Sequence, residues 1–214
     1  MPARLPDPPP AAQLREIGIR DQEYHTIAPE EVWWCVHRTE GEYVLAWNQF
    51  RQRAPHLRFD PQPTPAGQHD GVDIWYGAHT PTIALAEAFQ GDRTIDRRRG
   101  HPYLTGLRFT RPLHLIDITT TNAAAWATRA DGTYGLSTGP HSITQRWARR
   151  IIEAFPDVDG LLYNSGFAGG PCIAAFGAAQ TAMPPAPVLS LPLTHPGLAS
   201  RIATAAHRLG YLIY

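Results

Sequence analysis

The sequence predicts an α+β fold in which mixed or antiparallel sheets are flanked by helices. Runs of apolar, β-branched and aromatic residues with the length of strands come in clusters, and helical segments interrupt them irregularly. A doubly wound parallel sheet would instead alternate strands and helices in a regular order. Hydrophobic residues make up 43% of the 214 positions. That content is enough to bury a sizeable core in one domain with extensions.

The stretch IWYGAHTPTIALAEAFQ, residues 74–90, organises the predicted fold. A strand over residues 72–76 leads into a Gly-Ala-His turn, and a helix follows over residues 81–90. Thr80 is placed to cap this helix, and Pro81 stands at its first position, where the missing N–H costs nothing. Apolar residues then recur near helical spacing, so one face of the helix is expected to pack inward.

The remaining elements follow from the same two periodicities. Further strands are expected at residues 32–36, 101–109, 113–118, 161–163, 172–176, 188–193 and 211–214. Helices are expected at residues 119–130, 143–155 and 198–209, with a short helix or an ordered arm at residues 14–24. Residues 1–12 are rich in proline and are expected to be disordered. The expected division is a partly disordered N-terminal arm, residues 1–30, and one folded domain, residues 31–214.

Composition excludes several classes of function. Lys+Arg and Asp+Glu both number 19, and this balance does not favour direct binding of nucleic acid or of an anionic membrane. The basic run at residues 93–99 is expected to be a solvated loop, with phosphate contact as the minor alternative. No apolar run is long enough to span a bilayer, and the N-terminus lacks the apolar core of a signal peptide, so a cytoplasmic location is expected.

The two cysteines, Cys35 and Cys172, are far apart in the sequence and belong to no metal-ligand pattern. Each is flanked by apolar residues, which favours two buried free thiols. A disulfide between them is the alternative that the sequence leaves open. The sequence contains no phosphate-binding loop, dinucleotide fingerprint, zinc motif or nucleophile elbow, so no metal is expected.

Glu87 and Tyr76 are the first candidates for working residues. Glu87 lies beside the apolar stripe of its helix, where a carboxylate costs free energy unless it is paired or hydrogen-bonded. Such a carboxylate can bind ribose hydroxyls or stabilise the cation that forms as a glycosidic bond breaks. Tyr76 precedes a turn of small residues and can stack on a flat heterocycle. Its structural alternative is core packing with the hydroxyl at the rim.

Two arginines and two serines complete the candidate set. Arg38 ends a predicted strand and Arg58 precedes a proline-rich loop, and both can grip phosphate through paired donors. Ser165 stands in a turn beside a glycine, and Ser142 stands at the start of a predicted helix. Their structural alternatives are a surface arginine, a turn residue and a helix cap. Together the candidates describe a site for a nucleotide with a sugar and two phosphates.

The motifs around these residues resemble the RES domain family, the toxin half of bacterial Xre–RES toxin–antitoxin pairs. Val-His-Arg at residues 36–38 looks like the family's opening strand and arginine, and Leu-Arg-Phe-Asp at residues 57–60 stands where the family has Gly-Gly-Arg-Trp-Asn. Residues 74–76 and 81–87 resemble the family's strand and its TALAE helix. Asp-Gly-Leu-Leu-Tyr-Asn-Ser at residues 159–165 is similar to the late DGLLYPS element. The resemblance covers about residues 36–176.

This resemblance implies an ADP-ribosyltransferase-like fold and an enzyme that cleaves the nicotinamide–ribose bond of NAD, by hydrolysis or phosphorolysis, and so depletes the cofactor. It implies that Arg38 and Arg58 hold the phosphates and the nicotinamide ribose, that Tyr76 stacks on the nicotinamide, and that Glu87 stabilises the positive charge. Ser165 or Ser142 would orient the substrate. Arg58, Glu87 and Ser165 are therefore the expected catalytic residues, and Arg38, Tyr76 and Ser142 the expected NAD-binding residues.

The implied partners are NAD as a substrate, with no further cofactor, inorganic phosphate or water as the acceptor, and a helix-turn-helix antitoxin of the Xre type that covers the pocket. A homodimer is possible for toxins of this kind. Two alternatives remain open at this stage. One is transfer of ADP-ribose to a macromolecule. The other is a catalytically degenerate RES scaffold that binds a partner, which the replacement of the two family glycines by His56 and Leu57 motivates.

Overall fold

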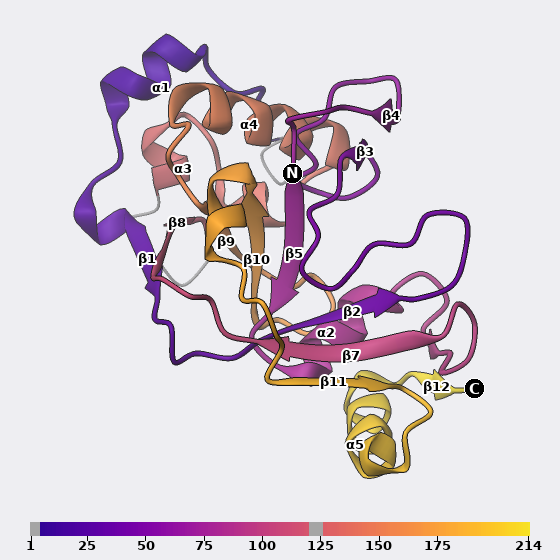
Figure 1. Ribbon diagram of the computed structural model, residues 1–214. Coiled ribbons are helices and arrows are strands. Elements are labelled where there is room, and N and C mark those ends of the chain that lie inside the picture. Colours follow the sequence, from indigo (N-terminus) through magenta and orange to yellow (C-terminus); the bar gives the residue numbers. More distant parts are fainter. Residues whose placement is uncertain (1–4, 120–125) are drawn as a thin grey trace.

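A computed structural model describes residues 5–119 and 126–214 of the chain. Its main feature is an eight-stranded sheet with the order β1-β8-β9-β10-β5-β2-β7-β11 (Figure 1). These strands are β1 (Tyr24–Ile27), β2 (Trp33–Arg38), β5 (Ile74–Ala78), β7 (Pro102–Leu107), β8 (Leu113–Asp117), β9 (Gly160–Asn164), β10 (Pro171–Phe176) and β11 (Leu189–Pro192). Two small sheets pair β3 (Arg53–Ala54) with β4 (Gly67–Gln68), and β6 (Thr94–Ile95) with β12 (Leu212–Ile213).

The helices lie around this sheet. They are α1 (Ala11–Ile17), α2 (Pro81–Ala88), α3 (Trp126–Arg129), α4 (His141–Ala154) and α5 (Ala199–Leu209), with 3₁₀ turns η1 (Asp21–Glu23), η2 (Tyr134–Ser137), η3 (Gly177–Ala182) and η4 (Pro196–Leu198). β8 and β9 run parallel, and the other neighbours in the large sheet run antiparallel. The predicted α+β class with a mixed sheet is therefore confirmed. The helix expected at residues 119–130 falls partly outside the described residues.

The large sheet forks between β5 and β2. These two strands share a single register pair, Trp34 with Ala78, whereas β2 pairs with β7 along its whole length. In Figure 1, β2, β7 and β11 cross almost at right angles to β5 and β10. Because the strands diverge after one pair, they leave an opening between the two halves of the sheet. Helix α2, which follows β5, packs against β2 beside this opening.

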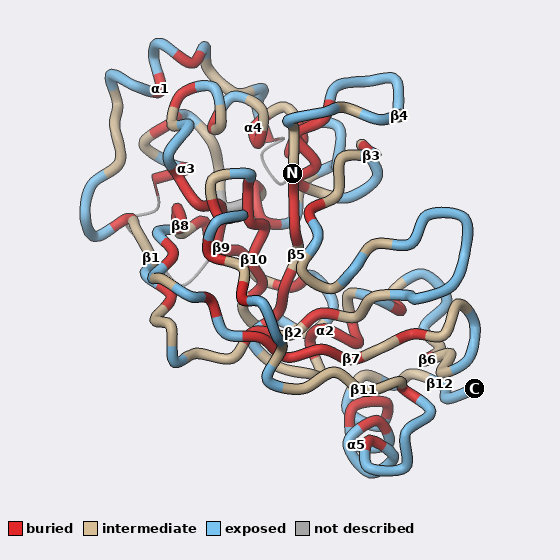
Figure 2. The backbone as a smooth tube through the Cα atoms, in the orientation of Figure 1, coloured by how far each residue is buried: buried red, intermediate tan, exposed pale blue. Residues whose placement is uncertain are grey.

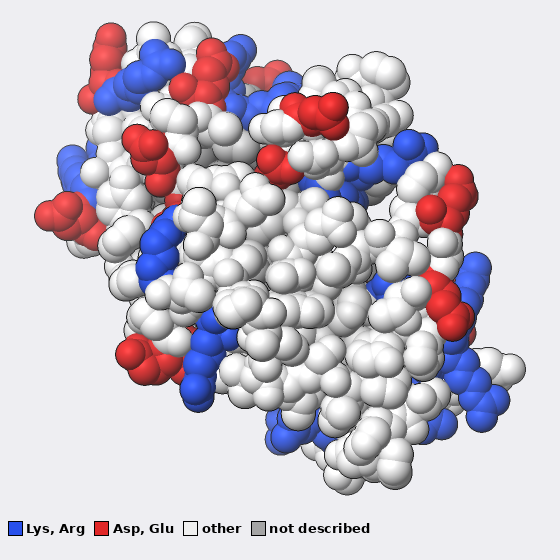
Figure 3. All heavy atoms as spheres, viewed as in Figure 1, with Lys and Arg blue, Asp and Glu red and all other residues white. Residues whose placement is uncertain are grey.

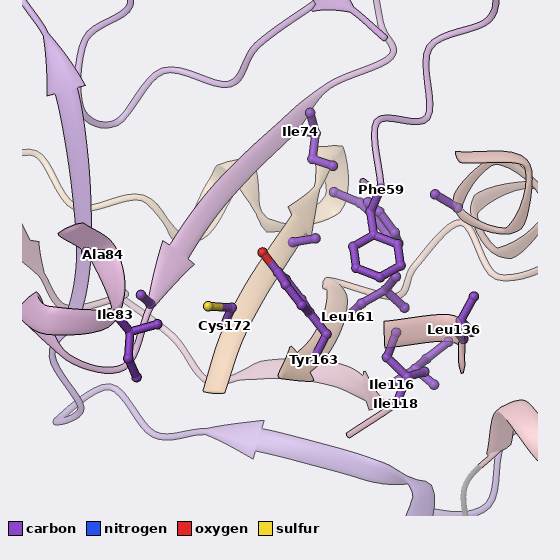
Figure 4. Packing of buried hydrophobic residues seen from close by; sticks show 14 of the residues in the cluster. Phe59, Ile74, Ile83, Ala84, Ile116, Ile118, Leu136, Leu161, Tyr163 and Cys172 are labelled. Atoms are coloured by element: carbon purple, nitrogen blue, oxygen red, sulfur yellow. The ribbon is translucent and has the colours of Figure 1, made fainter. Parts of the chain in front are cut away.

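Both faces of the sheet are buried, and successive residues of β10 show this. Cys172, Ala174 and Phe176 belong to the core cluster under α2 and α4, and Ile173 and Ala175 belong to a second cluster on the opposite face. Figure 2 shows β5, β9 and β10 buried and the connecting loops exposed. Figure 4 shows the first cluster, with Phe59 and Tyr163 packed between strands and helices.

The two cysteines lie on opposite faces of the sheet. Cys35 belongs to the second cluster and Cys172 to the first, and both are buried free thiols. The favoured interpretation is confirmed, and the disulfide alternative is wrong because the sheet separates the two side chains.

The N-terminal arm is ordered over its described part, which corrects the expected disorder of residues 5–12. Leu5 and Leu14 are buried in the first core cluster, and Trp147 on α4 donates a hydrogen bond to Pro6 O at 2.9 Å. Arg129 grips the buried carboxylate of Glu23 through two hydrogen bonds of 2.6 Å. The proline-rich composition predicted disorder. The prediction was wrong because composition does not reveal that α4 presents an apolar face against which the arm packs.

Truncating Leu14 tests whether the arm belongs to the folded unit. We expect Leu14→Ala to lower the free energy of unfolding by about 2–5 kcal/mol, since Leu14 is fully buried and its loss leaves a cavity. Urea denaturation followed by tryptophan fluorescence measures this. Glu16→Ala, at an exposed position of the same helix, is the matched control. Equal stability of the two variants would show that the arm does not contribute to the stability of the folded core.

Charged side chains are spread over the surface. Figure 3 shows acidic and basic residues interspersed around the margin of one face, with uncharged residues over its centre. The basic run at residues 93–99 surrounds β6, where Arg97 N donates to Tyr214 O at 3.1 Å. In the described part of the chain, no helix is long and apolar enough to cross a membrane, and no group of three His, Cys, Asp or Glu residues is placed to hold a metal ion.

Candidate active site

A pocket of about 170 Å³ lies at the fork of the sheet. β2 contributes Trp34, Cys35 and Val36, and β5 contributes residues 76–78. The other walls come from α2, from the loop before Asp60, and from the start of α4. The remaining lining residues are Leu57, Arg58, Ala84, Glu87, Ala88, Gln90, His141 and Tyr163. The pocket therefore combines one carboxylate with one guanidinium and several aromatic rings.

Glu87 reaches the pocket from the last turn of α2. Thr80 begins this helix by accepting a hydrogen bond from Ile83 N at 3.3 Å, and Pro81 follows it, as the sequence predicts. Burial raises the pKa of Glu87, and the hydrogen bond from Ser165 and the charge of Arg58 partly oppose that rise. Glu87 is therefore a carboxylate that gains stabilisation from any positive charge placed next to it.

Ser165 holds the carboxylate of Glu87 in place. Its Oγ donates to Glu87 Oε1 at 2.5 Å and accepts from the backbone N–H groups of Phe167 and Ala168 at 3.2 and 3.0 Å. Since the two amides occupy the lone pairs of the hydroxyl, its hydrogen is directed toward Glu87. Ser165 is buried, and its own backbone is fixed by a hydrogen bond from its N–H to Gly170 O at 2.8 Å.

The loop that carries Arg58 is wrapped around the side chain of Asp60. This carboxylate is fully buried and accepts hydrogen bonds from the backbone N–H groups of His56 and Leu57 at 2.6 and 2.7 Å. It also pairs with Arg51 at 2.6 Å and accepts from the Tyr76 hydroxyl at 2.9 Å. A buried charge with this many donors fixes the backbone on both sides of it.

Helix α4 holds the carbonyl groups of the same loop. Thr144 Oγ1 donates to Arg58 O at 2.5 Å, and Gln145 Nε2 donates to Leu57 O at 2.8 Å. The Arg58 side chain donates through Nη1 to Gly139 O at 2.6 Å, which leaves its other N–H groups for a ligand in the pocket. The loop before Asp60 is therefore held through its N–H groups by Asp60 and through its carbonyls by α4.

Two tyrosines form aromatic walls. The hydroxyl of Tyr76 is used by the protein, since it donates to Asp60 and accepts from Phe59 N at 3.0 Å. Burial and the neighbouring Asp60 charge raise the pKa of Tyr76 well above its usual value, so its hydroxyl stays protonated. Its ring lines the cavity. Tyr163, on β9, packs edge-on against Phe59 with ring centroids 5.0 Å apart and closes another wall.

The structure brings together four of the six predicted site residues. Arg58, Glu87 and Tyr76 line the pocket, and Ser165 contacts Glu87. Arg38 is exposed at the end of β2, where its stem lies against Gly100, and it does not line the pocket. It shares a strand face with Trp34 and Val36 by its spacing along β2.

Ser142 is exposed on the first turn of α4 and also lies outside the lining. Its neighbour His141 does line the pocket. Sequence reasoning missed His141, Tyr163 and Asp60. Tyr163 carried a usable signal, since it stands two residues before Ser165 at the end of a predicted strand. Nothing in the sequence marked Asp60, because its partners are distant in the chain or belong to the backbone.

Removing the Ser165 hydroxyl tests the geometry without any assay of activity. We expect Ser165→Ala to raise the pKa of Glu87, because the lost hydrogen bond stabilises the ionised carboxylate. Carboxyl-carbon NMR titration of labelled protein measures the shift. Ser142→Ala is the matched control and should leave the titration unchanged. An unchanged pKa in Ser165→Ala would mean that this hydrogen bond does not form in solution.

Comparison with known proteins agrees with the architecture. The chain matches the RES domain family over residues 32–194. A similar fold is found in a chain of the crystal structure of the M. tuberculosis MbcT–MbcA toxin–antitoxin complex. The TM-score is 0.60 and the sequence identity is 16%. The alignment covers 91% of this chain and 96% of that chain. At this identity the likeness shows a shared fold. Among curated proteins, none aligns significantly with this sequence.

Proposed function

This chain belongs to the RES domain family, and we propose that it is a toxin that cleaves the nicotinamide–ribose bond of NAD and so depletes the cofactor. The observation that carries this proposal is Glu87. It is a partly buried carboxylate oriented by Ser165 in a pocket with aromatic walls and one arginine. The toxin–antitoxin complex that shares the fold supports the same biological setting.

The chemistry begins with heterolysis of the bond between ribose C1′ and the nicotinamide nitrogen. The electron pair of this bond stays on the nitrogen, which becomes neutral, and positive charge develops on C1′ and the ring oxygen. The ionised carboxylate of Glu87 stabilises that charge. Burial makes the stabilisation larger than it would be in water, and Ser165 holds the carboxylate so that no reorientation is needed during the reaction.

Arg58 and the aromatic rings position the substrate. The free N–H groups of Arg58 bind the phosphate next to the nicotinamide ribose, and the rings of Tyr76 and Tyr163 enclose the flat nicotinamide. An oxygen of water or of inorganic phosphate then forms the new bond to C1′. Water gives ADP-ribose and releases a proton to the solvent, whereas an ionised oxygen of phosphate forms the bond without losing a proton and gives ADP-ribose 1″-phosphate.

Release of free nicotinamide tests the proposal. Purified protein is incubated with NAD, with and without inorganic phosphate, and nicotinamide is separated by chromatography. We expect release that depends on Glu87 and Arg58, and the effect of phosphate identifies the acceptor. NAD labelled in the adenylate half separates hydrolysis from transfer, because transfer leaves label on a macromolecule. A folded protein that releases no nicotinamide and labels nothing would refute the proposal and favour a binding scaffold.

The proposed partner is an antitoxin of the helix-turn-helix type that covers the pocket. Leu57, which lines the pocket, is 39% exposed, and Phe167, in the turn after Ser165, is 44% exposed. Large apolar side chains exposed near a site are typical of surfaces that a protein partner covers. Nicotinamide release should fall when such an antitoxin is added, and Phe167→Asp should weaken the inhibition. Unchanged inhibition in that variant would place the antitoxin elsewhere.

A further inference from the structure

A second groove, of about 480 Å³, adjoins the active-site pocket. Trp34 on β2 lines both cavities, and the groove lies between the first turn of α2 and the exposed face of α5. Its lining residues are Trp34, Pro81, Thr82, Ser200, Arg201, Thr204 and Arg208. Helix α5 lies beyond residue 194, where the match to the RES domain family ends.

The groove has the chemistry of an anion site. Arg201 and Arg208 are seven residues apart on α5 and therefore lie on the same helix face, next to the buried stripe formed by Ile202, Ala205 and Ala206. No carboxylate is among the lining residues, and the other polar groups are hydroxyls. Within residues 5–119 and 126–214, neither arginine lies in an ion pair. Two guanidiniums without an ion-pair partner, on one helix face and in one groove, suit a phosphate group.

Trp34 connects this groove to the active site. Its indole lies against Gly106 on β7, where an added Cβ would come within 2.8 Å of the ring. The absence of a side chain at Gly106 thus lets the indole pack directly on the sheet. On the groove side, the guanidinium of Arg201 is 5.9 Å from the centroid of the indole ring. A ligand that leaves the pocket past Trp34 therefore meets Arg201 next.

The active-site pocket is too small for a whole dinucleotide. Its volume of about 170 Å³ is below the roughly 300–1,000 Å³ of sites that hold drug-sized ligands. We propose that the groove between α2 and α5 binds the phosphate-bearing adenylate half of NAD, with Trp34 as the wall between the two halves. This inference rests on the proposed function. It assigns a binding site to the adenylate half of the substrate, which Arg38, outside the pocket lining, does not supply.

The experiment compares two substrates in a charge-matched pair of double variants. Arg201→Ala with Arg208→Ala removes the groove cations, and Arg98→Ala with Arg99→Ala removes two exposed arginines elsewhere. Cleavage of NAD is compared with cleavage of nicotinamide mononucleotide, which lacks the adenylate half. We expect the groove variant to raise KM for NAD by about 10–100-fold, since hydrogen bonds between charged groups are lost, with little change in kcat. Its KM for the mononucleotide should equal that of the wild type.

The possible results separate the inference from the function on which it rests. An unchanged KM for NAD in the groove variant, or an equal rise for both substrates, overturns the groove assignment. An increase for NAD in Arg38→Ala alone would place the adenylate half at the other end of β2 and would also overturn it. If the wild type cleaves neither substrate, the proposed function fails. Calorimetry with ADP then tests whether the groove binds the adenylate half. ADP bound about tenfold more weakly by the groove variant supports it, and equal affinity refutes it.

Discussion

Replacing Glu87 by glutamine should lower kcat for nicotinamide release by about 10²–10³-fold, with a smaller change in KM. Glutamine has nearly the same shape and can still accept the hydrogen bond from Ser165, but it cannot stabilise the positive ribose. The loss should therefore appear in the chemical step, where charge develops, more than in binding. Steady-state kinetics with NAD measure it, and Glu16→Gln, an exposed carboxylate on α1, is the isosteric control.

The same variant should be at least as stable as the wild type at neutral pH. Burial raises the pKa of Glu87 in the folded state above its usual value of 4.5. Between the unfolded and the folded pKa, the native state binds more protons, so the free energy of unfolding falls as pH rises through that window. Glutamine has no such titration. Thermal unfolding between pH 4 and pH 8 should therefore show that the melting temperature of Glu87→Gln increases relative to that of the wild type as the pH rises. A variant with near-normal kcat, or a relative loss of stability as pH rises, would contradict the assigned role.

Glu87 could be found from the sequence because the reasoning needed only local information. Helical spacing placed it beside an apolar stripe, and Thr80 with Pro81 marked where the helix begins. The structure confirms where the helix begins, but its buried residues 83–86 are consecutive, so the helix is covered on more than the one face that the spacing predicted. The strands that carry the site were also visible as short apolar runs. What the sequence could not give is the fork between β5 and β2, because strand order depends on long-range pairing that local periodicity does not encode.

The choice between the two serines shows the same limit. Ser142 and Ser165 both stand at plausible positions in the sequence, one before a helix and one in a turn. Only the antiparallel pairing of β9 with β10 and of β10 with β5 brings the turn at Ser165 to the end of α2. The disorder expected for residues 1–12 was wrong over the described residues 5–12 for a related reason, since their order depends on contacts with α4, more than a hundred residues away.

The second large effect should come from Asp60. We expect Asp60→Asn to lower the free energy of unfolding by about 3–5 kcal/mol and to reduce kcat as well. The carboxylate accepts four hydrogen bonds, from Arg51, His56 N, Leu57 N and the Tyr76 hydroxyl. An amide offers one oxygen and presents an NH₂ group to the remaining donors, so Arg51 loses its counter-charge and buried N–H groups lose their acceptor. Asp70→Asn, an exposed neighbour, should change stability by no more than about 0.5 kcal/mol.

Loss of activity in Asp60→Asn must be separated from loss of folding, and Tyr76 allows this. Tyr76→Phe keeps the ring that lines the pocket and removes only the hydroxyl that links Asp60 to Phe59 N. Because both side chains act on the loop that carries Arg58, a double-mutant cycle in kcat, measured where every variant is folded, should show a coupling free energy of about 0.5–3 kcal/mol. Additive effects on kcat would mean that the Asp60 network stabilises the fold without positioning Arg58. Coupling would instead mean that the pocket arginine owes its placement to a buried charge outside the pocket.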